Sequence, residues 1–233
     1  MLAGMISKSP LSNINFISGN MPTADWKFGV KAKNTMLPVN YRPHNLGRRG
    51  ENGQPFHTGF RHCPWERESQ DHVFNHCPHG VSLRNKRHDL ILDILESALI
   101  KLGIEYIRET PYPGTDSIQE PDLVINVPLK RNTIILDVKS PYDKAQNFAT
   151  AKAENEAKYR DLALTIHNVT NRNTTVKTFC VGALGSWDPD NDAVLEKLGF
   201  SKAQIRKLAS KSVNCAISTS HSIFRNHVNG PEG

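Results

Sequence analysis

The sequence of 233 residues has no long apolar run. No stretch approaches the roughly 20 consecutive apolar residues of a membrane-spanning helix. The first twenty residues, MLAGMISKSPLSNINFISGN, also lack the apolar segment of about 7–15 residues that a secretory signal peptide requires. We therefore expect a soluble intracellular protein with no membrane partner.

Cysteine is scarce. The chain has four cysteines, Cys63, Cys77, Cys180 and Cys215, and their wide spacing is not that of a disulfide framework. In a reducing compartment, burial or metal ligation explains them better than disulfides do. The sequence also lacks an internal repeat of 20–50 residues, which excludes solenoids and propellers.

Acidic residues are outnumbered. Lys and Arg total 29 against 23 Asp and Glu, and the sequence pI is about 9.2. This balance favours a polyanionic partner such as nucleic acid, although a single basic residue is more often simply solvated. The candidate nucleic-acid contacts are Arg48, Arg49, Arg61, Lys86, Arg87, Lys130 and Arg131.

Composition divides the chain into three parts. Residues 1–56 are rich in Pro, Gly, Asn and Arg and predict a basic, linker-like segment with one short helix. Residues 57–80 are rich in His and Cys. Residues 81–228 contain the periodic apolar patterns of a main domain, and 233 residues suffice for one core of useful size.

The main domain is predicted to alternate helices and strands. Apolar spacing predicts a helix from Ser82 to Gly103, followed by three strands and then further helices around one more strand. The expected strands are 104–110, 122–127, 133–138 and 176–184, and the expected later helices are 144–167, 190–200, 201–210 and a last one through 223. Ser201 and Gln204 fit a capping box. We expect an α/β fold with helices covering both faces of a sheet.

Two aspartates interrupt the apolar central strands. Asp122 stands where one strand begins and Asp137 near the end of the next, and Lys139, two residues further, shares a face with Asp137. Neighbouring carboxylates repel each other unless a cation such as Mg²⁺ neutralises them. Such an ion can polarise a phosphodiester and activate water. The alternative is an ordinary ion pair at the end of a strand.

Residues 57–80 contain a second group of candidate functional residues, the ligands of a metal site. His57, Cys63, His72 and Cys77 offer the imidazole and thiolate ligands of a structural Zn²⁺, whose binding would help to fold a stretch with few apolar residues. A CxxC pair is missing because Phe60 stands three residues before Cys63. His62, His76 and His79 would then be spare. The alternative is a His-rich loop with two incidental cysteines.

The order of these motifs resembles that of a known family. A Cys/His knuckle is followed by RHDLIL, EPDLVI, IILDVKSPYD, EAKY and VGALGSWDPDND. Over residues 25 to 228 this resembles the C-terminal region of non-LTR retrotransposon polyproteins with a restriction-like endonuclease, a group that includes elements inserting into ribosomal RNA genes. The resemblance implies a PD-(D/E)xK nuclease: an α/β, restriction-endonuclease-like mixed sheet flanked by helices, preceded by a small zinc-knuckle segment.

The resemblance also implies roles for single residues. Asp122 and Asp137 match the family's ligands for Mg²⁺ or Mn²⁺. Lys139 is the first choice for the catalytic lysine, with Lys158 and Lys152 as alternatives because the family's lysine often lies on the following helix. The family's zinc ligands match Cys63, His72 and Cys77. His57, which is not a family ligand, or a water would take the place of the cysteine that Phe60 replaces. For Arg87, His88 and Asp89 we expect capping and packing rather than DNA contact, and for Trp187 a place in the core.

The expected function is therefore a metal-dependent DNA endonuclease that nicks target DNA to prime reverse transcription. The resemblance implies action in the nucleus on a DNA target, with the element RNA as a further partner. The sequence has no YxDD-like motif of a reverse transcriptase, so we expect a fragment of the polyprotein. The alternative is a catalytically degenerate remnant that binds nucleic acid without cutting it.

Overall fold

A mixed sheet lies at the centre of the molecule. The computed structural model describes residues 9–41, 53–54, 59, 61–127 and 130–230. Within them, four strands pair in the order β1-β2-β3-β4. The first three are antiparallel, whereas β4 runs parallel to β3. The strands are β1 (Tyr106–Arg108), β2 (Leu123–Asn126), β3 (Asn132–Lys139) and β4 (Asn173–Cys180).

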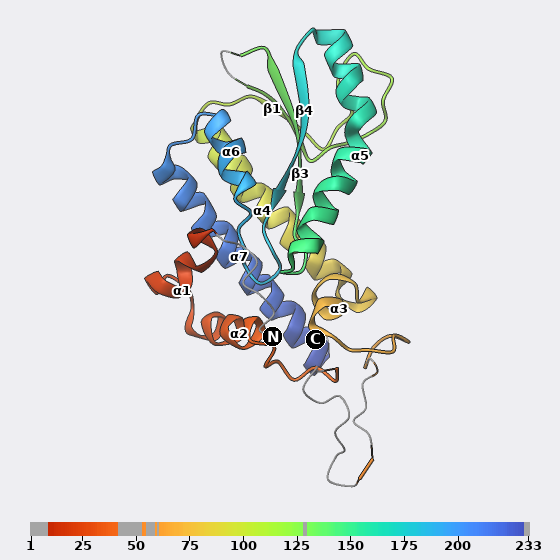
Figure 1. Cartoon of the computed structure of the whole chain (residues 1–233), viewed down its shortest axis with the longest axis vertical. Coiled ribbons are helices and arrows are strands. Elements are labelled where there is room, and N and C mark those ends of the chain that lie inside the picture. The colour runs from red at the N-terminus through yellow and green to blue at the C-terminus, as the bar shows by residue number, and fades with distance from the viewer. Residues whose placement is uncertain (1–8, 42–52, 55–58, 60, 128–129, 231–233) are drawn as a thin grey trace.

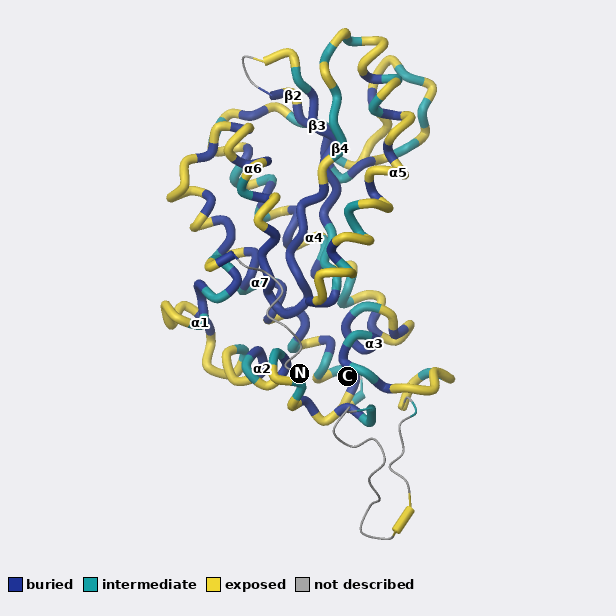
Figure 2. The backbone as a smooth tube through the Cα atoms, viewed as in Figure 1, coloured by how far each residue is buried: buried dark blue, intermediate teal, exposed yellow. Residues whose placement is uncertain are grey.

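Helices cover both faces of this sheet (Figure 1). Alternate residues of β2 and β3 point to opposite faces, so Val124 and Ile135 pack with Leu162 of α5, while Ile125 and Leu136 enter the larger core with α4 and α7. The tube in Figure 2 shows the buried strands between these layers. The helices are α4 (Val81–Lys101), α5 (Ala145–Thr170), α6 (Asp190–Lys197) and α7 (Lys202–Asn229).

This architecture is an α/β fold compatible with a restriction-endonuclease-like domain, as the sequence predicted. The order helix, three strands, helix, strand is confirmed from α4 to β4. Trp187 is fully buried and packs edge-on against Phe179, with 5.3 Å between ring centroids, so its predicted place in the core is also confirmed.

The N-terminal part contains more helix than the sequence predicted. Short helices η1 (Pro10–Asn13) and α1 (Ile14–Ser18) precede α2 (Thr23–Lys33). Phe28 of α2 is buried and contacts Phe74 and Phe224, so α2 belongs to the main core rather than to a linker. Local periodicity is weak here because tertiary contacts, not an extended apolar stripe, hold these short helices in place. The exact boundaries of the three predicted parts stay a prediction.

The C-terminal region forms one long helix where short ones were expected. Helix α7 runs through 28 residues and begins at the predicted capping box of Ser201 and Gln204. Its middle buries polar residues such as Ser212 and Ser220, and the Ser220 hydroxyl donates to the carbonyl of Ala183. Buried serines interrupt the apolar pattern without interrupting the helix. This explains why the sequence predicted short helices instead of one long one.

A small helical segment precedes α4. Helix α3 (Gln70–Asn75) is followed by η3 (Pro78–Gly80), which leads directly into α4. In the described part of the chain, no helix is both long and apolar enough to cross a membrane.

Candidate functional site

The antiparallel pairing of β2 with β3 brings the two aspartates together. Leu123, the first residue of β2, pairs with Leu136, so Asp122 immediately before β2 lies close to Asp137 of β3. Asp137 lies on the same face of β3 as Ile135, which is the face covered by α5. Asp137 is only 1% exposed, so its carboxylate needs partners that compensate for lost water.

Asp137 has two such partners. Tyr159 of α5 donates its hydroxyl to Asp137 Oδ1 at 3.2 Å, and the Lys139 ammonium forms an ion pair with Asp137 Oδ2. The predicted shared face of Asp137 and Lys139 is therefore present. Burial and the neighbouring Asp137 carboxylate raise the pKa of Tyr159, which keeps its hydroxyl protonated as a donor.

Asp122 is held by a different pair of groups. Its Oδ2 accepts the Val138 amide at 2.6 Å and lies 2.9 Å from Nε2 of His88 in α4. Burial would raise the pKa of Asp122, but the hydrogen bonds from His88 and Val138 outweigh it and lower that pKa. The hydrogen bond to Asp122 raises the pKa of His88 to about 9. Burial opposes this rise, and the Asp89 carboxylate adds to it.

The contact of His88 with Asp122 differs from the expected capping or packing role. Sequence reasoning missed it because 34 positions separate the two residues and only the tertiary fold brings α4 to the start of β2. For Arg87 the packing prediction is right. Its guanidinium donates to Ser220, Asn75 and two backbone carbonyls in the interior.

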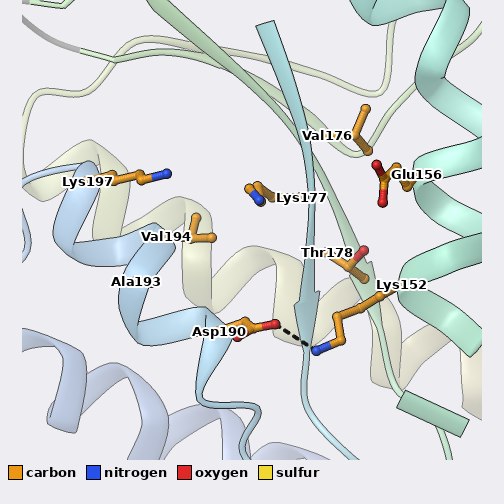
Figure 3. Close-up of a pocket in the computed structure, with 9 residues that line it drawn as sticks. All are labelled: Lys152, Glu156, Val176, Lys177, Thr178, Asp190, Ala193, Val194 and Lys197. Atoms are coloured by element: carbon orange, nitrogen blue, oxygen red, sulfur yellow. Dashed lines mark hydrogen bonds and ion pairs between the residues drawn. The ribbon is translucent and has the colours of Figure 1, made fainter. Parts of the chain in front are cut away.

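The alternative catalytic lysines occupy different places. The Lys158 ammonium donates to the Tyr159 hydroxyl at 2.6 Å, so it reaches Asp137 through one intervening group. Lys152 instead forms ion pairs with Asp188 and Asp190 at 3.0 and 2.7 Å. It lines a separate pocket between α5, β4 and α6 (Figure 3). Lys139 and Lys158 are therefore the lysines linked to the paired carboxylates.

Three of the predicted zinc ligands converge. The ligand atoms of Cys63, His72 and Cys77 all lie within 4.8 Å of one another, and Cys63 Sγ lies 3.4 Å from His72 Nε2. In a tetrahedral site with ordinary Zn–S and Zn–N bonds, the same two atoms would be about 3.6 Å apart. Both the donor set and its spacing fit Zn²⁺. His57 and Phe60 lie outside the described residues.

Two of the three cluster residues, His72 and Cys77, are buried, and Cys63 is half-buried. Cys77 is 1% exposed, and burial raises the pKa of its thiol and lowers the pKa of His72. The spare histidines have other contacts. His62 stacks on His79 with 4.7 Å between centroids, and His76 lies 3.5 Å from Asp71.

The predicted basic contacts fall into three groups. Lys86, Lys130 and Arg131 are exposed, whereas Arg48 and Arg49 lie outside the described residues. Arg61 is also exposed, but its guanidinium pairs with Glu68 at 3.4 Å. The prediction that Arg87 contacts nucleic acid is wrong. Arg87 is only 3% exposed, so it is a structural residue and offers no surface for DNA. Its charge could not be distinguished from that of a surface arginine by sequence alone.

Comparison with known proteins links the chain to retrotransposon polyproteins. No protein-family model matches the chain. The chain is similar to the retrovirus-related Pol polyprotein from type-1 retrotransposable element R2 of Popillia japonica, with 28% identity over 210 residues. The similarity covers 87% of this chain and 40% of that polyprotein. The chain thus spans less than half the length of its relative, and the similarity supports an origin in a retrotransposon polyprotein.

Proposed function

From this origin and the paired carboxylates, we propose that the chain is a divalent-metal-dependent DNA endonuclease of a non-LTR retrotransposon. The observation that carries the proposal is the placement of Asp122 beside Asp137, with the Lys139 ammonium on Asp137. The biological reaction would be a nick in target DNA from which reverse transcription is primed. That reaction would take place in the nucleus, with the element RNA as a second nucleic-acid partner.

The chemistry of the site fits Mg²⁺ or Mn²⁺. Asp122 and Asp137 would hold the ion through carboxylate oxygens, the ligands that such hard cations prefer. When bound, the ion polarises the phosphodiester and activates a water molecule. It would also offset the repulsion between two carboxylates on neighbouring strands.

In this proposal, the residues around the two carboxylates have different roles. Tyr159 fixes Asp137 through its hydroxyl, and the Val138 amide fixes Asp122. Lys139 can donate hydrogen bonds to a non-bridging phosphate oxygen, where negative charge grows as water attacks phosphorus. In the hydrolysis, a bond from the water oxygen to phosphorus forms as the water loses a proton, while the bond from phosphorus to the 3′ oxygen of deoxyribose breaks and that oxygen takes up a proton.

The decisive experiment is a nicking assay on supercoiled plasmid with Mg²⁺ or Mn²⁺. We expect the wild type to nick and Asp137→Ala to lose all detectable nicking, because one metal ligand is gone. Asp161→Asn, on the exposed side of α5, is the matched control and should nick normally. A wild type that binds DNA but never nicks it would favour the degenerate, nucleic-acid-binding remnant. Nicking that survives in both Asp122→Ala and Asp137→Ala would reject this site.

We also propose that Cys63, His72 and Cys77 hold a structural Zn²⁺. The spacing of their ligand atoms supports this proposal. The fourth ligand would be His57 or water. The ion would link the loop around Cys63 to α3 and to the start of η3, and would thereby hold the knuckle against α4.

A further inference from the structure

His88 lies between two carboxylates. Its Nε2 is 2.9 Å from Asp122 Oδ2, and its Nδ1 is 3.1 Å from Asp89 Oδ1. An ionised carboxylate can only accept hydrogen bonds, so each ring nitrogen acts as a donor. The ring is thus held from both sides in one orientation.

The helix that carries His88 is firmly packed. Ile91, Leu92 and Leu95, in the next turns of α4, are fully buried in the main core. The neighbouring Arg87 is also buried and donates to Ser140, the residue that follows β3. The backbone at His88 therefore has little freedom relative to the strands that carry the two aspartates.

The two donors on Asp122 determine how its carboxylate is presented. Val138 and His88 both bond Oδ2, and no group of the described residues donates to Oδ1. Two bonds to one oxygen fix the rotation of the carboxylate and leave Oδ1 with free lone pairs. Oδ1 is therefore the atom of Asp122 that is available to a cation.

We propose that His88 is a positioning residue for the metal ligand Asp122. It orients Asp122 through Nε2, while Asp89 orients the imidazole through Nδ1. This inference rests on the proposed function, because it assigns Asp122 to a divalent cation. Groups that orient metal ligands in this way typically contribute 10- to 100-fold in metal affinity or activity.

Two amide variants of different length separate this role from mere packing. Glutamine places its amide nitrogen near the position of Nε2 and can still donate to Asp122, whereas asparagine is too short to do so. We expect His88→Asn to weaken Mn²⁺ binding by ~10-fold or more and His88→Gln to stay within ~3-fold of the wild type. Mn²⁺ binding is measured by the electron paramagnetic resonance signal of free Mn²⁺, without DNA.

Two further measurements complete the test. The Mg²⁺ concentration that gives half-maximal nicking should rise in His88→Asn by the same factor as the Mn²⁺ dissociation constant. His221→Asn is the matched control, since His221 also pairs with an aspartate, Asp25, at 2.7 Å but contacts neither catalytic carboxylate. It should leave both metal measurements unchanged. Thermal unfolding followed by circular dichroism shows whether each variant is folded.

The outcomes for the inference and for the proposed function are distinct. If the wild type nicks DNA, Asp137→Ala does not, and His88→Asn binds Mn²⁺ like the wild type, the nuclease stands and the role of His88 is rejected. Equal impairment of His88→Gln and His88→Asn also rejects it, because reach to Asp122 would not matter. A wild type that neither binds Mn²⁺ nor nicks DNA in its presence would overturn both proposals.

Discussion

At the scale of single residues, the paired carboxylates are surrounded by lysines with different contacts. Lys139 touches Asp137 directly, and Lys158 touches it only through Tyr159. A lysine that stabilises charge in the transition state contributes more to turnover than to DNA affinity. The two lysines can therefore be distinguished by kinetics rather than by binding.

We predict that Lys139→Ala lowers the rate constant for nicking by ~10²-fold or more while DNA affinity changes little. Single-turnover nicking and a fluorescence-anisotropy titration measure the two quantities. Lys152→Ala is the control on α5, because Asp188 and Asp190 already neutralise that lysine. If Lys158→Ala is the inactive variant and Lys139→Ala is not, the catalytic lysine is on the helix.

At the scale of elements, the knuckle depends on a few buried contacts. Glu68 has a fully buried side chain that pairs with His227 at 3.3 Å and with Arg61, and this ties the loop to the end of α7. Burial would raise the pKa of Glu68, but the hydrogen bonds from His227 and the Asn40 amide, together with the charges of His227 and Arg61, outweigh it and lower that pKa. Within the same segment, Cys63, His72 and Cys77 converge as a separate group.

We predict about one Zn²⁺ per chain in purified protein, and less than a tenth of that in Cys77→Ser. Elemental analysis measures the content. Cys215→Ser, which changes a cysteine of α7 outside the cluster, should keep the metal. Removing zinc with a chelator should lower the unfolding temperature of the wild type, because binding free energy contributes to folding.

Substitutions at the two positions outside the described residues test the fourth ligand. Phe60→Cys should tighten zinc binding, because it adds a thiolate at the position where the resembled family has one. His57→Ala should weaken binding only if His57 is a ligand. Protein without zinc, or Phe60→Cys with unchanged affinity, would indicate a loop that has lost its metal and would favour a degenerate copy.

At the scale of the whole molecule, the excess of six positive charges favours a polyanionic partner. Arg87 does not contribute a surface contact, and Arg61 is partly neutralised by Glu68. Exposed lysines and arginines such as Lys86, Lys130 and Arg131 remain as candidate phosphate contacts. Each phosphate that they neutralise would release counterions from DNA.

We predict that DNA binding weakens with salt, with a slope of log K against log salt of about −0.9 per phosphate contact. Replacing Lys130 and Arg131 together by Ala should make the slope shallower by about 2 if both contact DNA. Arg108→Gln is the control, because Asp93, Glu96 and Glu109 already surround that guanidinium. Binding that does not depend on salt would contradict a nucleic-acid partner.

Local sequence patterns were sufficient to predict the central helix and strands of the fold. Helix α4, the strands around Asp122 and Asp137 and the capping box of α7 were predicted within a few residues, because apolar periodicity and end signals act over short distances. The shared face of Asp137 and Lys139 followed from the two-residue repeat of a strand. Three zinc candidates were also identified by residue type and later found together.

Other features of the fold and the site depend on long-range contacts, which local sequence patterns do not reveal. The bond between His88 and Asp122, the burial of Arg87 and the packing of Phe28 each join segments that are distant in the chain. Whether an arginine is a surface charge or an interior donor depends on which elements pack over it, and the chain's local pattern is the same in both cases. The continuity of α7 likewise required partners such as Ala183 for its buried serines, because a serine satisfied inside the core has the same sequence signature as one in a loop.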